Sequence, residues 1–145
     1  NLFIMIDKKD LFIKWLPSLV GIQYLKNGRD LRGFDCFGFI LWVYNIIFKY
    51  NIQDIPNKNQ TYILKELEDN WAEIIKDKIQ TGDLITCLSK KNKSGLRFYN
   101  HAGIAISPTK FIHCAKEKGV LISNTETYNK VMEKIKVFRF KNNYE

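Results

Sequence analysis

Three residues of this chain have types and positions that suit nucleophilic chemistry, and the first of them is Cys36. It follows Asp35, a candidate helix N-cap, and opens an apolar run. A thiol in that position experiences the partial positive charge of the helix N-terminus, which favours the thiolate and lowers the pKa. The alternative is a small apolar core residue, which is the common role of a buried cysteine.

The other two residues are the only histidines of the chain, His101 and His113, and each lies in a predicted strand. If these strands form a hairpin around Pro108, the imidazoles can lie side by side on one face. A thiolate nucleophile needs an imidazole within hydrogen-bond reach, and the imidazole needs a polar group that fixes its tautomer. Cys36, His101 and His113 can therefore supply a Cys-His-His catalytic triad.

Cysteine and histidine can also bind a metal ion, and a lone strand histidine is more often structural. The sequence contains no CxxC and no HExxH pattern. His113 and Cys114 are adjacent, and neighbouring side chains of a strand point to opposite faces. The pair cannot reach one ion, so we expect no metal and no cofactor.

Length and composition predict one folded domain over residues 1–145. The 145 residues are 46% hydrophobic and 14% aromatic, which excludes a disordered chain. The richest apolar run, 37–48, is interrupted by Asn45 and is too short for a membrane span.

Three cysteines cannot all pair, so we expect at least one free thiol. Residues 1–10 lack a basic region and a cleavage site, so we expect no signal peptide there.

The net charge of +8 comes from 19 lysines and only 4 arginines. Base recognition and bidentate phosphate contacts depend mainly on arginine, so we expect no nucleic-acid partner. The lysines are scattered, and they are densest in 89–93. We interpret them as a solvated basic surface, with a negatively charged cell wall as the alternative partner.

Hydrophobic periodicity predicts helices first and strands afterwards, which indicates an α+β fold with an antiparallel sheet of about five strands. Apolar spacing predicts a helix over 7–16 that stops at Pro17, a buried helix from Cys36 to residue 50, and an amphipathic helix over 61–78. Short β-branched or aromatic runs predict the strands. They cover 83–89, 101–107, 110–115, 120–124 and 135–140. The Cys36 helix should pack on this sheet.

Four local sequences, in order, resemble motifs of the NlpC/P60 family of papain-like cell-wall peptidases. GFDCFGFI at 33–40 resembles the nucleophile motif, and GDLI at 82–85 resembles a strand start of the family. HAGIAI at 101–106 resembles the strand with the catalytic histidine. FIHCA at 111–115 resembles the segment with the third polar residue. The resemblance covers about residues 20–140.

The resemblance implies a minimal papain-like domain and a role for each position. Cys36 would be the nucleophile, His101 the general base and acid, and His113 the residue that orients His101. Tyr24, 12 residues before Cys36, matches a family tyrosine placed near the nucleophile and could stabilise the oxyanion. The implied substrate is the peptidoglycan stem peptide, cut between D-γ-glutamate and the diamino acid, so the enzyme would act at the cell wall.

The chain departs from the family pattern at Phe37, where the family has serine. In family members that serine and the aspartate at Asp35 hold the free amino end of the stem peptide. Phe37 has no hydroxyl, so this chain lacks one of the two groups on which that specificity depends. Asn27 and Cys114 also replace the usual glycine and alanine.

The stretch 28–38 is most similar to a branch found in phage tails and gene-transfer particles, which would deliver the enzyme and be its partners. Two alternatives remain, an assembly protein that retains the fold and a papain-like amidase or acyltransferase with another substrate.

Overall fold

The computed structural model describes residues 7–55, 58–131 and 134–141, with the backbone alone at 129–131. Within these residues, a π-helical turn, η1 (Val43–Ile47), extends the second α-helix, and a 3-10 turn, η3 (Lys76–Lys78), precedes the strand β4 (Leu84–Leu88). The α-helices are α1 (Lys8–Leu19), α2 (Cys36–Trp42), α3 (Gln60–Asn70) and α4 (Thr125–Val131).

An antiparallel sheet of six strands forms the centre of the molecule, in the spatial order β3-β8-β4-β5-β6-β7. Its strands are β3 (Trp71–Ile74), β4 (Leu84–Leu88), β5 (Tyr99–Ala105), β6 (Lys110–Ala115), β7 (Gly119–Asn124) and β8 (Lys134–Phe140). A separate two-stranded ribbon, β1 (Arg29–Asp30) and β2 (Gly33–Phe34), directly precedes α2. The α+β prediction is therefore confirmed.

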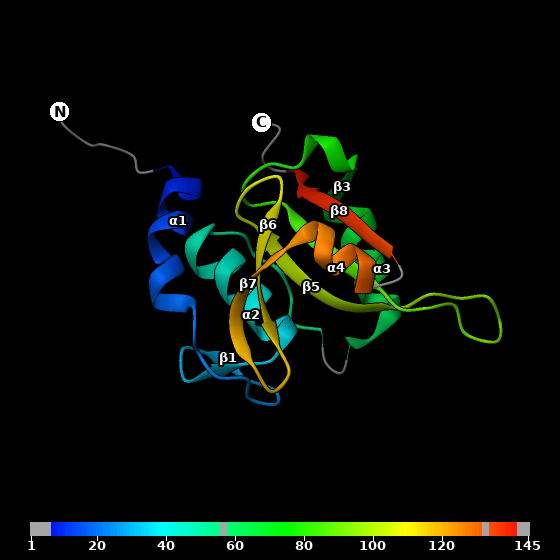
Figure 1. Ribbon diagram of the computed structural model, residues 1–145, viewed down its shortest axis with the longest axis horizontal. Helices are drawn as coiled ribbons and strands as arrows, with labels where there is room; N and C mark the ends of the chain where they lie inside the picture. The colour runs from blue at the N-terminus through cyan, green and yellow to red at the C-terminus, as the bar shows by residue number, and fades with distance from the viewer. Residues whose placement is uncertain (1–6, 56–57, 132–133, 142–145) are drawn as a thin grey trace.

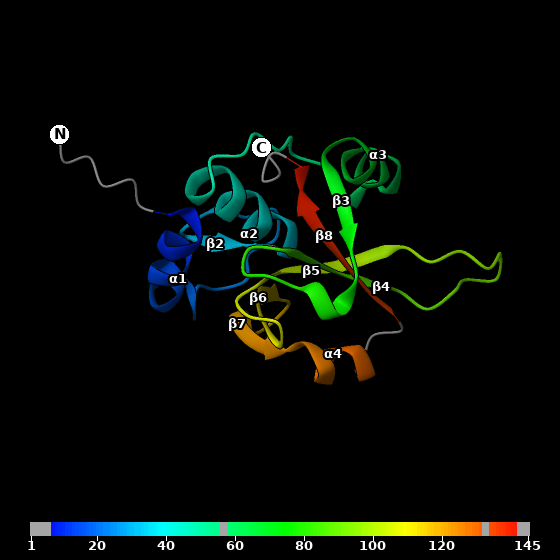
Figure 2. The same cartoon turned by 90° about the horizontal axis from the view of Figure 1, so that it is seen from above.

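Helices cover both faces of the sheet. Figure 1 shows α1 and α2 beside β5, β6 and β7, and Figure 2 shows α2 and α3 on one side of the sheet with α4 on the other. The larger core lies between α1, α2 and the sheet, and it contains several fully buried aromatic side chains. These are Phe12, Phe34, Phe39 and Tyr44. Because this core surrounds α2, it fixes the helix that begins at Cys36.

Three predictions of local structure need correction. The helix predicted over 61–78 ends at Asn70, and the chain continues as β3, where Trp71 pairs with Phe140. Trp71 is buried in an aromatic cluster there, so tertiary packing overrides the helical spacing. α1 continues through Pro17 to Leu19 although Pro17 has no N–H to donate to the carbonyl four residues back, and Leu19 in this last turn is fully buried in the core. The helix α4, on the face opposite α2, was not predicted.

Candidate active site

A capped helix start holds Cys36 in place. Asp35 is the N-cap, and its Oδ1 accepts a hydrogen bond of 2.7 Å from the backbone N–H of Gly38. Arg29 donates to the same Oδ1 at 2.7 Å, so the N-cap carboxylate is also one half of an ion pair. A Cβ at Gly38 would collide with the carbonyl oxygen of Gly28. Glycine at this position therefore allows the ribbon to pack directly on the first turn of α2.

The hairpin of β5 and β6 brings the two histidines together, as predicted. Its register pairs Ile104 with Ile112, and His101 Nε2 lies 2.7 Å from His113 Nδ1. The two rings meet edge to face, with centroids 4.9 Å apart. His113 is buried, so its hydrogen bonds must be made within the protein.

Two residues next to the histidines were missed by the sequence reasoning. Ser123 on β7 places its Oγ 2.7 Å from His113 Nε2. Tyr128 on α4 packs its ring against both imidazoles. Its ring centroid lies 5.0 Å from that of His113 and 5.9 Å from that of His101. The strand at 120–124 was predicted, but no local pattern distinguishes Ser123 from other polar strand residues, and Tyr128 lies in the helix that was not predicted.

The hydrogen bonds are compatible with His101 as a base that accepts a proton on Nδ1, the ring nitrogen that does not face His113. If His101 keeps Nδ1 unprotonated, its Nε2–H donates to His113 Nδ1. The proton of His113 is then on Nε2, where it donates to Ser123 Oγ. This arrangement satisfies every ring nitrogen of the two histidines except His101 Nδ1, which remains available for proton transfer.

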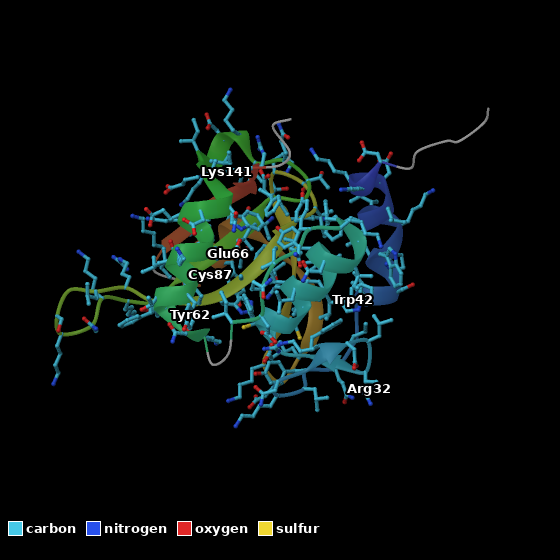
Figure 3. All side chains as sticks on the ribbon, turned by 180° about the vertical axis from the view of Figure 1, so that it is seen from behind. Arg32, Trp42, Tyr62, Glu66, Cys87 and Lys141 are labelled. Atoms are coloured by element: carbon cyan, nitrogen blue, oxygen red, sulfur yellow. The ribbon has the colours of Figure 1, made fainter. Side chains whose placement is uncertain are left out.

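Cys36 and His101 line one cavity of about 80 Å³ on the side of the sheet that carries α2 and α3. Phe37, half-buried, forms part of its wall. Figure 3 views this side, with α2 and α3 in front of the sheet. Tyr24 and Asp35 are not in the cavity lining. Tyr24 bridges to Phe34 on β2, and burial, followed by the charges of Cys36 and Asp35, raises its pKa.

Burial determines the protonation of the reactive groups. It lowers the pKa of His101 to about 4, with a further contribution from Lys58, and the pKa of His113 to about 3. Burial also raises the pKa of Cys36, and Asp35 adds to this, while Lys58 acts in the opposite direction. The expected lowering of the Cys36 pKa is therefore wrong in sign. Both shifts favour a thiol and a neutral imidazole over an ion pair.

The other two cysteines are less acidic than Cys36. Cys87 and Cys114 are fully buried, and burial raises the pKa of each to about 12. The Cys114 thiol donates a hydrogen bond of 3.1 Å to the carbonyl of Phe34, directly before the N-cap. This bond gives a structural reason for a cysteine at a position where the motif that this segment resembles has alanine. All three cysteines are free thiols.

Neither a metal-binding cluster nor a membrane-spanning helix occurs within residues 7–55, 58–131 and 134–141. No three His, Cys, Asp or Glu side chains in these ranges are grouped so that they could hold a metal ion. None of the helices there is long and apolar enough to cross a membrane.

Sequence comparison relates this chain to peptidoglycan enzymes. A family model described as the NlpC/P60 family matches residues 21–138. An Escherichia coli protein named murein DD-endopeptidase MepS/murein LD-carboxypeptidase is 27% identical over 124 residues, which are 86% of this chain and 58% of that protein. The probable endopeptidase NlpC of Escherichia coli is 30% identical over 111 residues, 77% of this chain and 64% of that protein. The chain thus spans less than two thirds of the length of either relative.

Solved structures share the fold. The NlpC/p60 domain of the peptidoglycan hydrolase SagA superposes with a TM-score of 0.59 at 19% identity, covering 89% of this chain and 97% of that one. A Staphylococcus aureus protein described as similar to a lipoprotein of the NLP/P60 family gives a TM-score of 0.62 at 18% identity, covering 94% of this chain and 44% of that one.

Proposed function

The chain belongs to the NlpC/P60 family, and from this membership we propose that it is a cysteine peptidase that hydrolyses peptidoglycan stem peptides at the cell wall. The observation that carries the proposal is the shared cavity of Cys36 and His101, with His101 held by His113 at 2.7 Å. Residues 1–145 would form one catalytic domain.

In the proposed reaction, Cys36 Sγ attacks the carbonyl carbon of the scissile amide while its proton passes to His101 Nδ1. The backbone N–H of Cys36 and the hydroxyl of Tyr24 are the proposed donors to the oxyanion. The tetrahedral intermediate collapses to a thioester, and the imidazolium of His101 gives its proton to the leaving amine. Water, deprotonated by His101, then hydrolyses the thioester and restores the thiol.

His113 orients His101 in this scheme, and it remains neutral throughout. When His101 becomes an imidazolium, its Nε2–H still needs an acceptor, and His113 Nδ1 provides one. No cofactor is required, because the thiol and imidazole carry out both half-reactions.

The proposed bond is the one between D-γ-glutamate and the diamino acid. The name of one Escherichia coli relative refers to DD-endopeptidase and LD-carboxypeptidase activities, so these are the competing bonds. Delivery by a phage-like particle is a separate proposal, and it rests on the sequence of residues 28–38 alone.

Mass spectrometry of defined peptidoglycan fragments, incubated with the wild type or with Cys36→Ala, tests the proposal. A new amino terminus on the diamino acid, absent with Cys36→Ala, is the expected result. Cleavage next to D-alanine would redirect the bond assignment, and no wall product of any kind would reject the peptidoglycan substrate.

A further inference from the structure

The connection between β4 and β5, residues 89–98, projects from the molecule as an arm, which Figures 1 and 2 both show. Hydrogen bonds organise it at its base and at its tip. The backbone N–H of Ser89 donates to the carbonyl of Phe98 at 2.9 Å, and Asn92 Oδ1 accepts from two backbone N–H groups of the tip at 2.9 and 3.0 Å. Residues 90–96 are all exposed. The arm therefore presents an ordered surface to the surroundings of the protein.

The positive charge of the chain is concentrated around this arm. Residues 84–116 contain six lysines and arginines and no aspartate or glutamate, whereas the rest of the chain contains 17 lysines and arginines against 15 acidic residues. Six of the eight net charges thus belong to this one segment. Four of its cations are in the arm itself. They are Lys90, Lys91, Lys93 and Arg97.

The three arm lysines have no acidic partner. Among the residues that the structure describes, no ion pair involves Lys90, Lys91 or Lys93. Each of them is exposed, and two are adjacent in sequence. Like charges held close together repel one another, and an anion bound among them relieves that repulsion. The arm is therefore complementary to a negatively charged partner.

The arm lies beside the candidate active site along the chain. It ends at Phe98, directly before Tyr99, and Tyr99 and His101 on β5 line the cavity of Cys36. The strand on its other side, β4, lines the same cavity through Thr86. A polymer that is engaged at Cys36 thus has its neighbouring parts close to the strands from which the arm projects.

The polymer proposed as substrate is itself an anion. A glutamate that is linked through its γ-carboxyl keeps its α-carboxylate free, so each stem peptide contributes negative charge, and an intact wall repeats this charge from stem to stem. A single exposed ion pair contributes little to binding, but several that form together on one polymer add up through their high effective concentration. Lysine, a point charge on a flexible stem, suits such a partner because no fixed geometry is required.

We propose that the arm of residues 89–98 binds the carboxylates of stem peptides other than the one engaged at Cys36, and so holds the enzyme on polymeric peptidoglycan. The inference rests on the proposed function, because it takes the partner from the proposed substrate. An anionic membrane fits less well. Binding to a bilayer also needs buried apolar area, and the large apolar side chains of the arm are only Leu96 and Phe98, which are 57% and 40% exposed.

Cosedimentation of Cys36→Ala with intact sacculi tests the arm without turnover. Raising the salt from about 0.01 M to about 1 M shortens the Debye length from about 30 Å to about 3 Å, so binding should weaken strongly. Adding Lys90→Gln, Lys91→Gln and Lys93→Gln together should weaken binding at low salt by at least about fivefold. All three side chains are exposed, so the melting temperature should stay that of the parent protein.

The matched control removes the same charge elsewhere. Lys14→Gln, Lys26→Gln and Lys78→Gln, at three exposed positions outside the arm, should together change binding by less than about twofold. An equal loss in the control and in the arm variant would show that net charge alone acts, and would overturn the inference. Unchanged binding of the arm variant would do the same.

Chemical treatment of the sacculi identifies the anion. Amidation of their carboxylates with a carbodiimide and ethanolamine should abolish the difference between Cys36→Ala and the arm variant. Removal of phosphodiester polymers with hydrofluoric acid should preserve it. The opposite pattern, or tighter binding to vesicles of anionic phospholipid than to sacculi, would overturn the assignment to stem-peptide carboxylates.

The two proposals fail separately in this experiment. If binding depends on the arm but the wild type releases no fragment from the same sacculi, the wall-binding surface stands and the proposed peptidase function fails. If the wild type releases fragments but the arm variant binds as tightly as its parent, the function stands and the inference about the arm is wrong.

Discussion

His101 Nε2 and His113 Nδ1 lie 2.7 Å apart, so a single proton links the two imidazoles. The direction of that hydrogen bond decides whether His101 can act as a base towards Cys36. Ser123 Oγ, 2.7 Å from the other nitrogen of His113, can accept the remaining proton, as the productive tautomer requires. Three residues on three adjacent strands therefore form one hydrogen-bonded chain behind the reactive nitrogen of His101.

Removing His113 should reduce activity less than removing His101. His101→Ala eliminates the proton carrier, and general acid–base catalysis typically contributes about 10²–10⁴-fold. His113→Ala eliminates only the orientation and the choice of tautomer. Both variants should be compared by kcat/KM on the same peptidoglycan fragment. A loss with His113→Ala equal to or greater than that with His101→Ala would show that the roles are assigned wrongly.

Ser123→Ala should disturb the tautomer of His113. The variant leaves the buried Nε2–H without its acceptor, at a cost of about 1–3 kcal/mol in the free energy of unfolding. Nitrogen-15 chemical shifts of the two imidazoles report the tautomers directly. A loss of stability alone would leave the tautomers of the folded protein unchanged. Ser123→Thr keeps the hydroxyl and should restore both the shifts and kcat. Unchanged shifts in Ser123→Ala would contradict this role.

The low pKa values of the two histidines predict loss of stability in acid. In the folded state they are about 4 for His101 and about 3 for His113, below the ordinary value of 6.5. Between pH 6.5 and about 4 the unfolded chain therefore binds more protons, so the free energy of unfolding falls as the pH falls. The slope is at most about 1.4 kcal/mol per pH unit for each histidine.

Urea unfolding of the wild type and of a His101→Gln/His113→Gln variant at several pH values isolates this effect. The variant lacks both groups, so it should show a shallower decline between pH 6.5 and 4.5, above the range in which most carboxylates titrate. Parallel curves for the two proteins would mean that the histidines titrate normally in the folded state.

Phe37 should make the enzyme tolerate stem peptides that are still attached to the sugar. Phe37 has no hydroxyl for a free amino terminus, and Arg29 already occupies the carboxylate of Asp35 at 2.7 Å. Intact sacculi and free tetrapeptide should be compared by kcat/KM, with Phe37→Ser in parallel. A preference of the wild type for the free peptide of about tenfold or more would refute this prediction.

The sequence predicted the parts of the site that depend on local chemistry. Asp35 as N-cap and the pairing of His101 with His113 follow from a capping residue and from two strands joined at Pro108. The ion pair between Arg29 and Asp35 depends on how the ribbon folds back, so no periodicity reports it. The sign of the Cys36 pKa shift depends on burial, which the helix-start argument did not include.

The contacts of Glu66 and Ser123 were also beyond local sequence. The pairing of Glu66 with Trp71 arises because α3 ends at Asn70 and the chain turns into β3. Ser123 reaches His113 across two neighbouring strands whose register no sequence pattern specifies. The sequence separations are only five and ten residues, but each contact depends on where the chain turns and pairs, and the residue types are unremarkable at their positions.

The most direct test of the central claim, that Cys36 is the nucleophile, is site-resolved alkylation by iodoacetamide measured together with residual hydrolysis. Cys87 and Cys114 are fully buried with pKa values of about 12, so Cys36 should be labelled first. One equivalent on Cys36 should abolish hydrolysis of peptidoglycan fragments. Equal labelling of all three thiols in the folded protein, or full activity after complete labelling of Cys36, would contradict the claim.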